Sequence, residues 1–194
     1  MRRKTFDVLA SVAGLVLAAV LAVGGGLMLW GHNFVDNQVS SQLTAQKIVF
    51  PVKTNPEFKA LPAADAAAMG QYAGQMLTTG AQAKVYANDF IKVHLSEMPY
   101  GGVYSKVSAA SMADPTNTKL AGLKATVFQG TTLRGLLLEA YAFWQMGVIA
   151  LWGAIVAFIG AGLLLVLSIL GFVHAGRVSP TTEFMPKHTE KVTA

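Results

Sequence analysis

The chain has 194 residues, of which 53% are hydrophobic and 13% are charged, and this composition favours a membrane protein over a soluble domain of the same length. It contains no cysteine, which excludes disulfides, thiolate metal sites and a cysteine nucleophile. The net charge of +5 does not indicate nucleic acid as a partner, because the basic excess lies mostly at the chain ends, outside residues 31–142.

The first predicted element is a membrane-spanning helix over residues 8–30, preceded by a short cytoplasmic segment, 1–7. Ser11 is the only polar side chain of this run, which would extend about 35 Å as a helix and could cross a bilayer. A cleaved signal peptide is the alternative, because the run follows a basic start. We favour an uncleaved anchor, since the run is longer than the apolar part of a signal peptide and no small-residue cleavage site follows it.

Residues 31–142 are predicted to form a small helical domain outside the cytoplasm. Val35, Val39 and Leu43 recur every four residues, which indicates that the first span continues as a stalk helix. Three prolines between positions 51 and 62 then predict an extended segment without regular helix.

Several short helices are predicted between this extended segment and the second span. The first begins with Asp65 as its N-cap and ends at Gly80, and the second covers residues 81–97. Residues 103–112 form either a short helix or a turn-rich segment, and residues 116–129 form another helix that ends at Gly130.

A second membrane-spanning helix is predicted over residues 143–173. Its helical pattern begins earlier, with Thr131 or Thr132 as the N-cap, so residues 131–142 belong to the domain and continue into the span. Residues 148–173 carry no charge, and Ser168 is their only polar side chain. The predicted fold class is therefore all-α, with two transmembrane helices and a small extracytoplasmic bundle built on their outward extensions.

The charges nearest the predicted spans indicate that both termini are cytoplasmic. Basic residues precede the first span and Arg177 follows the second, whereas the nearest charges on the other side, Asp36 and Glu139, are acidic. The expected location is the cell membrane, as a two-pass protein in contact with the lipid bilayer. Residues 174–194 are expected to be a disordered cytoplasmic tail.

Small residues form rows along both predicted spans. Such rows let helices approach closely, either within one hairpin or between copies of the chain. We favour packing within the hairpin, and self-association or a protein partner is the alternative. The residues are Gly14, Ala18, Ala22 and Gly26 in the first span and Gly153, Ala157 and Ala161 in the second.

Four segments give the chain a specific resemblance to a known family: the start MRRKTFDVLASVAGLVLA, YANDFI from Tyr86, YSKVSAASMADPTNTKLAGL from Tyr104, and TLRGLLLEAYAFWQMG from Thr132. These segments resemble an uncharacterised family of small two-span bacterial membrane proteins. Some members carry the label "aromatic ring-opening dioxygenase, LigA-like". The resemblance covers nearly the whole chain and brings no catalytic residues with it.

The residues offer little support for the chemistry in that label. A non-haem iron site needs two histidines and a carboxylate on one face of the metal. The soluble domain has His94 and Glu97 at helical spacing, but a third ligand would have to be His32 or a distant acid such as Asp36. We expect no catalytic residues, no catalytic metal and no cofactor, with His94 and Glu97 as weak metal candidates only.

The sequence therefore predicts a membrane-anchored module, without catalytic activity, that binds a partner protein or a small ligand outside the cytoplasm. No nucleophile motif, phosphate loop or zinc-protease motif occurs in the chain. Two alternatives remain open: an enzyme such as the ring-opening dioxygenase of the label, and a sensor or accessory subunit of a larger membrane complex.

Overall fold

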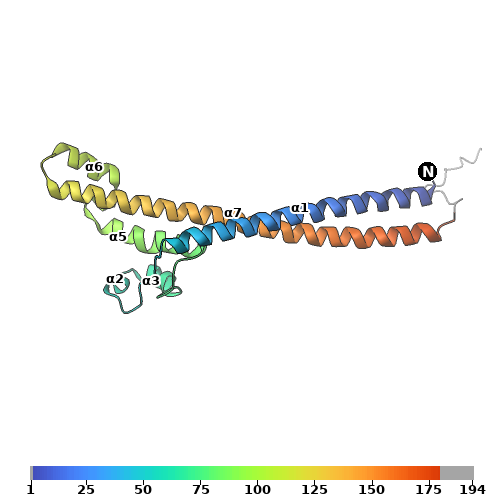
Figure 1. Cartoon of the computed structure of the whole chain (residues 1–194), viewed down its shortest axis with the longest axis horizontal. Helices are drawn as coiled ribbons and strands as arrows, with labels where there is room; N and C mark the ends of the chain where they lie inside the picture. Colours follow the sequence, from blue (N-terminus) through green and yellow to red (C-terminus); the bar gives the residue numbers. More distant parts are fainter. Residues whose placement is uncertain (1, 180–194) are drawn as a thin grey trace, which may run out of the picture. The chain divides into compact units, whose positions relative to one another are not determined.

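A computed structural model describes residues 2–179, and this part of the chain is helical, with turns, an isolated β-bridge and no strand. The two longest helices are α1 (Arg3–Ala45) and α7 (Thr118–Arg177), drawn in blue and in yellow to red in Figure 1. The all-α prediction is confirmed. The chain divides into two compact units, one made of residues up to Gly31 and from Ala150 onward, the other of His32–Ile149.

Both long helices contain a stretch that is long and apolar enough to cross a membrane. Only 11% of the most apolar stretch of α1 and 6% of that of α7 is buried against protein. A core helix of a soluble protein would be mostly buried, and these two stretches are not.

The first unit is a hairpin of α1 and α7 packed through small residues. Within this unit the buried positions of α1 are Ser11, Ala18 and Gly25, and those of α7 are Ala154, Ala161, Ser168 and Ala175. Each set repeats every seven residues, which is the period of helices that pack along a shared left-handed seam. The two serines face glycines across this seam: a Cβ on Gly14 would lie 2.5 Å from Ser168 Oγ, and one on Gly171 would overlap Ser11.

The small residues that form one row in the sequence of the first span do not all lie in this interface. Gly14 and Ala18 are packed within the hairpin, but Ala22 and Gly26 are exposed, and no atom lies within 4 Å of the place a Gly26 Cβ would take. Positions four apart drift by about 40° around a helix at each step, so the row leaves the interface. On α7, Gly153 meets Met28 and Ala157 meets Gly25.

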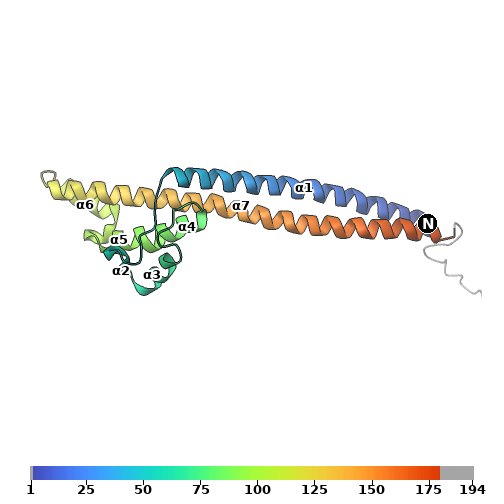
Figure 2. The same cartoon turned by 60° about the horizontal axis from the view of Figure 1, so that its bottom comes forward.

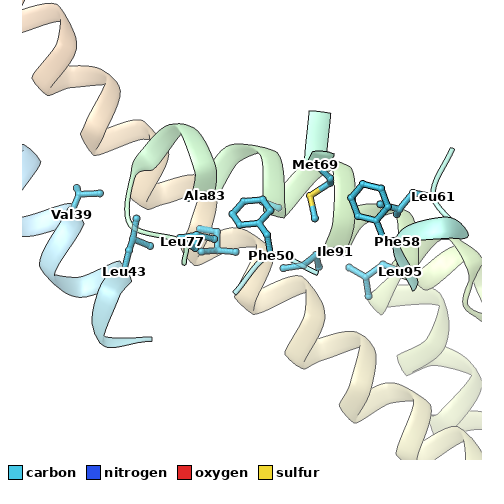
Figure 3. Packing of buried hydrophobic residues seen from close by; sticks show 12 residues of the cluster. Val39, Leu43, Phe50, Phe58, Leu61, Met69, Leu77, Ala83, Ile91 and Leu95 are labelled. Carbon is cyan, nitrogen blue, oxygen red and sulfur yellow. The ribbon is translucent and has the colours of Figure 1, made fainter. Parts of the chain in front are cut away.

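The second unit has its own hydrophobic core around Phe50, which is 1% exposed (Figure 3). Its ring lies 5.3 Å from Tyr72 and 5.3 Å from Tyr86, measured between ring centroids. The long helices complete the core, α1 with Val39 and Leu43 and α7 with Leu137. The segments between them supply the other buried members: Phe58, Leu61, Met69, Leu77, Ala83, Ala87, Ile91 and Leu95.

Between residues 46 and 79 the chain differs from the prediction in two ways. The proline segment is not purely extended, because α2 (Pro56–Lys59) begins at a proline, which the first turn of a helix tolerates, with Asn55 as its cap. Helix α3 (Ala63–Gly70) begins after Pro62, so Asp65 lies in its first turn and is not the cap. The helix also ends well before Gly80, because residues 74–77 pair with residues 48–50 through backbone hydrogen bonds.

Residues 80–97 form one helical run, close to the predicted range. It comprises α4 (Gly80–Val85), the π-helical segment η1 (Tyr86–Ile91) and α5 (Lys92–Glu97). Thr79 begins the run with a capping box, in which its side chain accepts from the Gln82 amide and the Gln82 side chain accepts from the Thr79 amide. Figure 2 shows this run with α2 and α3 beside it.

The prediction that one helix ends at Gly130 and another starts at Thr131 or Thr132 is wrong, because α7 is continuous from Thr118. Asn117 caps its start by accepting from the Leu120 amide at 3.2 Å. A Cβ on Gly130 would lie 2.9 Å from the Leu95 side chain, so this glycine permits a close approach of α5. Before α7, the turn η2 (Pro99–Gly102) leads to α6 (Tyr104–Ala113), which confirms a helix near residues 103–112.

At its other end α7 continues through Arg177. Residues 174–177 of the predicted disordered tail are therefore helical, and Gly176 does not end the helix. The remainder of the predicted tail, residues 180–194, lies outside the described residues.

Candidate docking groove

A groove of about 600 Å³ lies in the second unit between the last turns of α1 and the middle of α7. Its volume is in the range of pockets that bind ligands, and its surface is mostly apolar. The lining residues are Phe34, Val35, Gln38, Val39, Gln42, Leu43, Gln46 and Ile48 on one side and Leu133, Leu136, Leu137, Glu139, Ala140 and Phe143 on the other.

The side chains on the floor of the groove belong to the hydrophobic core of the unit, whereas the apolar side chains along its rim are exposed. Val39, Leu43 and Leu137 are at most 8% exposed, so the floor is fixed by packing. Leu136 and Phe143 are 58% and 51% exposed, although both are large apolar side chains. Exposed apolar side chains that gather beside a concavity mark interaction surfaces.

Three glutamines line the α1 side of the groove. Gln38 and Gln42 are four residues apart on one side of α1, about 6 Å from each other, and Gln46 follows in the turn just after the helix ends. All three are exposed, and their side-chain amides form no hydrogen bond to any residue between 2 and 179. They present a row of hydrogen-bond donors and acceptors beside the apolar floor.

Glu139 is the only charged residue that lines the groove. The basic residue nearest to it in the sequence is Arg134, five positions earlier. In the structure Nη2 of Arg134 donates to Asn88 Oδ1 at 2.9 Å instead. Glu139 is exposed and forms no ion pair within the described part of the chain, so the groove carries one uncompensated negative charge.

The bond between Arg134 and Asn88 joins α7 to the π-helical segment η1, within the stretch YANDFI. A π-helical turn shifts side chains out of the α-helical register and often occurs at functional positions. Here it places the Asn88 amide toward α7. The Nε atom of Arg134 is buried and has no partner within residues 2–179.

The structure does not bring the weak metal candidates together with a third ligand. His94 Nδ1 donates to the backbone oxygen of Phe90 at 2.8 Å, and its ring lies 4.4 Å from the Phe90 ring. Glu97 is exposed. No group of three His, Asp or Glu able to hold a metal ion is found among residues 2–179. The expected absence of a catalytic metal stays a prediction.

His32, the third candidate, has a structural contact in the second unit. Its Nδ1 donates to the backbone oxygen of Gly147 at 3.0 Å, and this bond joins α1 to α7. A Cβ on Gly147 would lie 3.3 Å from Val35, so the glycine lets the two helices approach at this point. The neutral ring must carry its proton on Nδ1, because a carbonyl oxygen can only accept.

The titratable groups with shifted pKa values lie away from the groove. Partial burial raises the pKa of Asp89, and the neighbouring carboxyl of Asp65 raises it further, whereas Lys92 and Lys84 act in the opposite direction. Burial also raises the pKa of the Tyr86 hydroxyl, with a smaller contribution from Glu57. These shifts accompany the packing of α3 against η1 and do not assemble an acid and base around a cavity.

The spacing of Val35, Val39 and Leu43 predicts a helical stripe, but no role was predicted for the glutamines beside them. The signal was available, since Gln38, Gln42 and Gln46 have the same spacing of four. That these amides face a groove depends on the partner helix, which is ninety residues further along the chain and cannot be placed from periodicity alone.

Comparison of the chain with protein-family models, with curated proteins and with solved structures found no match. The resemblance to the two-span bacterial family therefore stays a prediction, and the function has to be argued from the residues themselves.

Proposed function

We propose that the chain is a membrane-anchored interaction module. Two spans hold it in the cell membrane with both termini in the cytoplasm, and the second unit binds a partner on the other side through the groove between α1 and α7. The observation that carries the proposal is the groove itself, with an apolar floor, an exposed apolar rim and few polar groups.

Two features support the anchoring part of the proposal. The apolar stretches of α1 and α7 leave almost all of their side chains unburied, as lipid-facing helices do. The basic residues Arg2, Arg3, Lys4 and Arg177 lie at the ends of these helices that would face the cytoplasm, in agreement with the excess of basic residues on that side of membrane proteins.

Labelling of single cysteines in intact cells tests this topology, because the chain has no cysteine of its own. Ser105→Cys and Thr5→Cys both introduce an exposed thiol, the first in α6 and the second at the start of α1. A maleimide that does not cross membranes should label position 105 and should label position 5 only after the cells are opened. The reverse pattern would overturn the topology.

Co-purification tests the binding part of the proposal. The protein is isolated in mild detergent as wild type, as Leu136→Ser in the groove rim, and as Met112→Ser, which removes an exposed apolar side chain elsewhere. A partner that recurs with wild type and Met112→Ser but is lost with Leu136→Ser supports the proposal. Retention of the same proteins by all variants, or substrate turnover by the pure protein with no recurring partner, would contradict it.

A further inference from the structure

The groove is elongated along the helices that form it. Residues 34–45 of α1 extend about 17 Å, and residues 133–143 of α7 extend about 15 Å. A cylinder about three helical turns long fits a channel of this length between two helices. The side chains of a third helix can pack into the spaces between the side chains of the apolar floor. The apolar side chains that anchor such a helix recur every three or four residues.

The row of glutamines distinguishes a helix from a simple hydrocarbon chain as the occupant. The amides of Gln38 and Gln42 lie about 6 Å apart along one rim, and Gln46 continues the row just past the end of α1. A hydrocarbon chain has no polar group to meet them. A bound helix presents polar flanking side chains at the same interval, one turn apart, and so can form hydrogen bonds along the whole row.

Charge complementarity defines the occupant further. Glu139 is the sole charged group of the lining, and no cation within residues 2–179 forms an ion pair with it. An occupant with a Lys or Arg near this position would compensate the charge, and an acidic occupant would be repelled. A second copy that docked through the same face would bring two concave surfaces and two Glu139 carboxylates together, which both shape and charge disfavour.

We infer that the groove receives an amphipathic helix of a partner protein, which lays its apolar stripe on the floor and presents a basic residue to Glu139. The inference rests on the proposed function and specifies the kind of partner. The glutamine row fixes the direction and register of the helix, and the exposed side chains of Leu136 and Phe143 cover its sides.

Peptide binding to the full chain in nanodiscs of phosphatidylcholine tests the inference. The probes are two fluorescent helical peptides of about 14 residues. They share one leucine stripe and differ only in a central Lys or Glu. We expect the Lys peptide to bind about tenfold more tightly than the Glu peptide, after subtraction of binding to empty nanodiscs. Glu139→Lys should invert this preference, and Glu139→Gln should abolish it.

Matched variants identify the groove as the place of binding. Leu136→Ser should weaken binding of the Lys peptide by about tenfold, and Met112→Ser should leave it unchanged. Both side chains are exposed, so neither change is expected to unfold the unit, and the helical circular dichroism of each variant verifies this. Gln42→Ala should weaken binding more than Asn37→Ala, which removes an amide outside the groove.

Three results would overturn the inference. One is equal binding of the two peptides, or binding of neither. Another is that the chain binds a fluorescent fatty acid, that Leu136→Ser releases it, and that the two peptides show no difference in affinity. That result would assign the groove to a lipid. The third is a dimer of the chain that Leu136→Ser dissociates, which would assign it to a second copy. If co-purification still depends on Leu136, the proposed function survives; if it does not, both fail.

Discussion

Arg134 donates a hydrogen bond from Nη2 to Asn88 Oδ1 over 2.9 Å, so a cation of α7 is held by a neutral amide of η1. No carboxylate forms an ion pair with this guanidinium within residues 2–179. The arrangement joins the start of the groove-forming part of α7 to the helical run packed against it. Arg134 therefore does not pair with Glu139, five residues further along α7.

Substitutions of Asn88 should change the free energy of unfolding according to how well the new side chain accepts a hydrogen bond from Arg134. Asn88→Asp offers Arg134 a carboxylate and should raise the free energy of unfolding by about 1 kcal/mol at neutral pH. Asn88→Ala leaves the partly buried guanidinium without an acceptor and should lower it by about 1 to 3 kcal/mol. Urea denaturation followed by circular dichroism measures both. Equal stability of the three proteins would show that the bond contributes nothing.

The seam of the hairpin predicts different outcomes for two glycines of α1. Gly14→Leu would push a side chain into Ser168 and should destabilise the hairpin by about 1 to 3 kcal/mol. Gly26→Leu makes the same change where no atom lies within 4 Å, and the better helix propensity of leucine should leave stability unchanged or slightly higher. Thermal unfolding in detergent compares them. Equal loss in both variants would contradict the seven-residue seam.

Gly26→Leu also tests self-association through Ala22 and Gly26, the small residues of α1 that do not pack within the hairpin. Gly26 and Ala22 are exposed, and we expect them to serve as the contact if the chain associates with itself in the membrane. Cross-linking in detergent should then show an oligomer that Gly26→Leu dissociates without unfolding the monomer. An oligomer unaffected by this change would rule the face out.

Gly80 should not tolerate a side chain, because a Cβ there would overlap the Trp144 side chain. Gly80→Ala is expected to destabilise the second unit by about 1 to 3 kcal/mol, since Trp144 would have to move from α4. Gly135→Ala is the control, because it adds a methyl group in open space within α7 and should stabilise by up to about 1 kcal/mol. Denaturation curves that shift in the same direction for both would contradict this packing.

Asp89 predicts a pH dependence of stability. Its pKa is raised in the folded protein by burial and by Asp65, so the folded state binds the proton more tightly than the unfolded chain does. The stabilisation is fully present below the ordinary pKa of an aspartate and is lost as pH rises through the raised value. Asp89→Asn should therefore raise the free energy of unfolding slightly at neutral pH, because solvent screens this partly exposed side chain. Melting curves near pH 4 should show less difference, and a difference independent of pH would contradict the assignment.

Much of the helical fold follows from periodicity and composition. Two long apolar runs and the spacing of four from Val35 to Leu43 predict long helices. A helix with that spacing carries its apolar side chains on one side, where they can be buried together. The helix break predicted at Gly130 failed for a tertiary reason. A glycine inside a helix marks either an end or a close approach, and the contact with Leu95 that decides between them comes from a segment more than thirty residues away.

The groove could be predicted only in part. The sequence from Leu133 to Phe143 has the pattern of an ordinary apolar stripe. Periodicity does not reveal that Leu137 is buried, whereas its neighbour Leu136 is 58% exposed. That difference depends on how closely α1 approaches α7, through His32 and Gly147, and this is a property of the folded unit.

Photo-crosslinking from within the groove is the most direct test of whether a partner protein occupies it in the cell. A benzophenone amino acid replaces Leu136 in one strain and Met112 in another, and intact cells are irradiated. The account predicts one recurring protein adduct from position 136, mapped to a helical segment with a basic residue, and none from position 112. The same adducts from both positions, or no adduct from position 136, would contradict it.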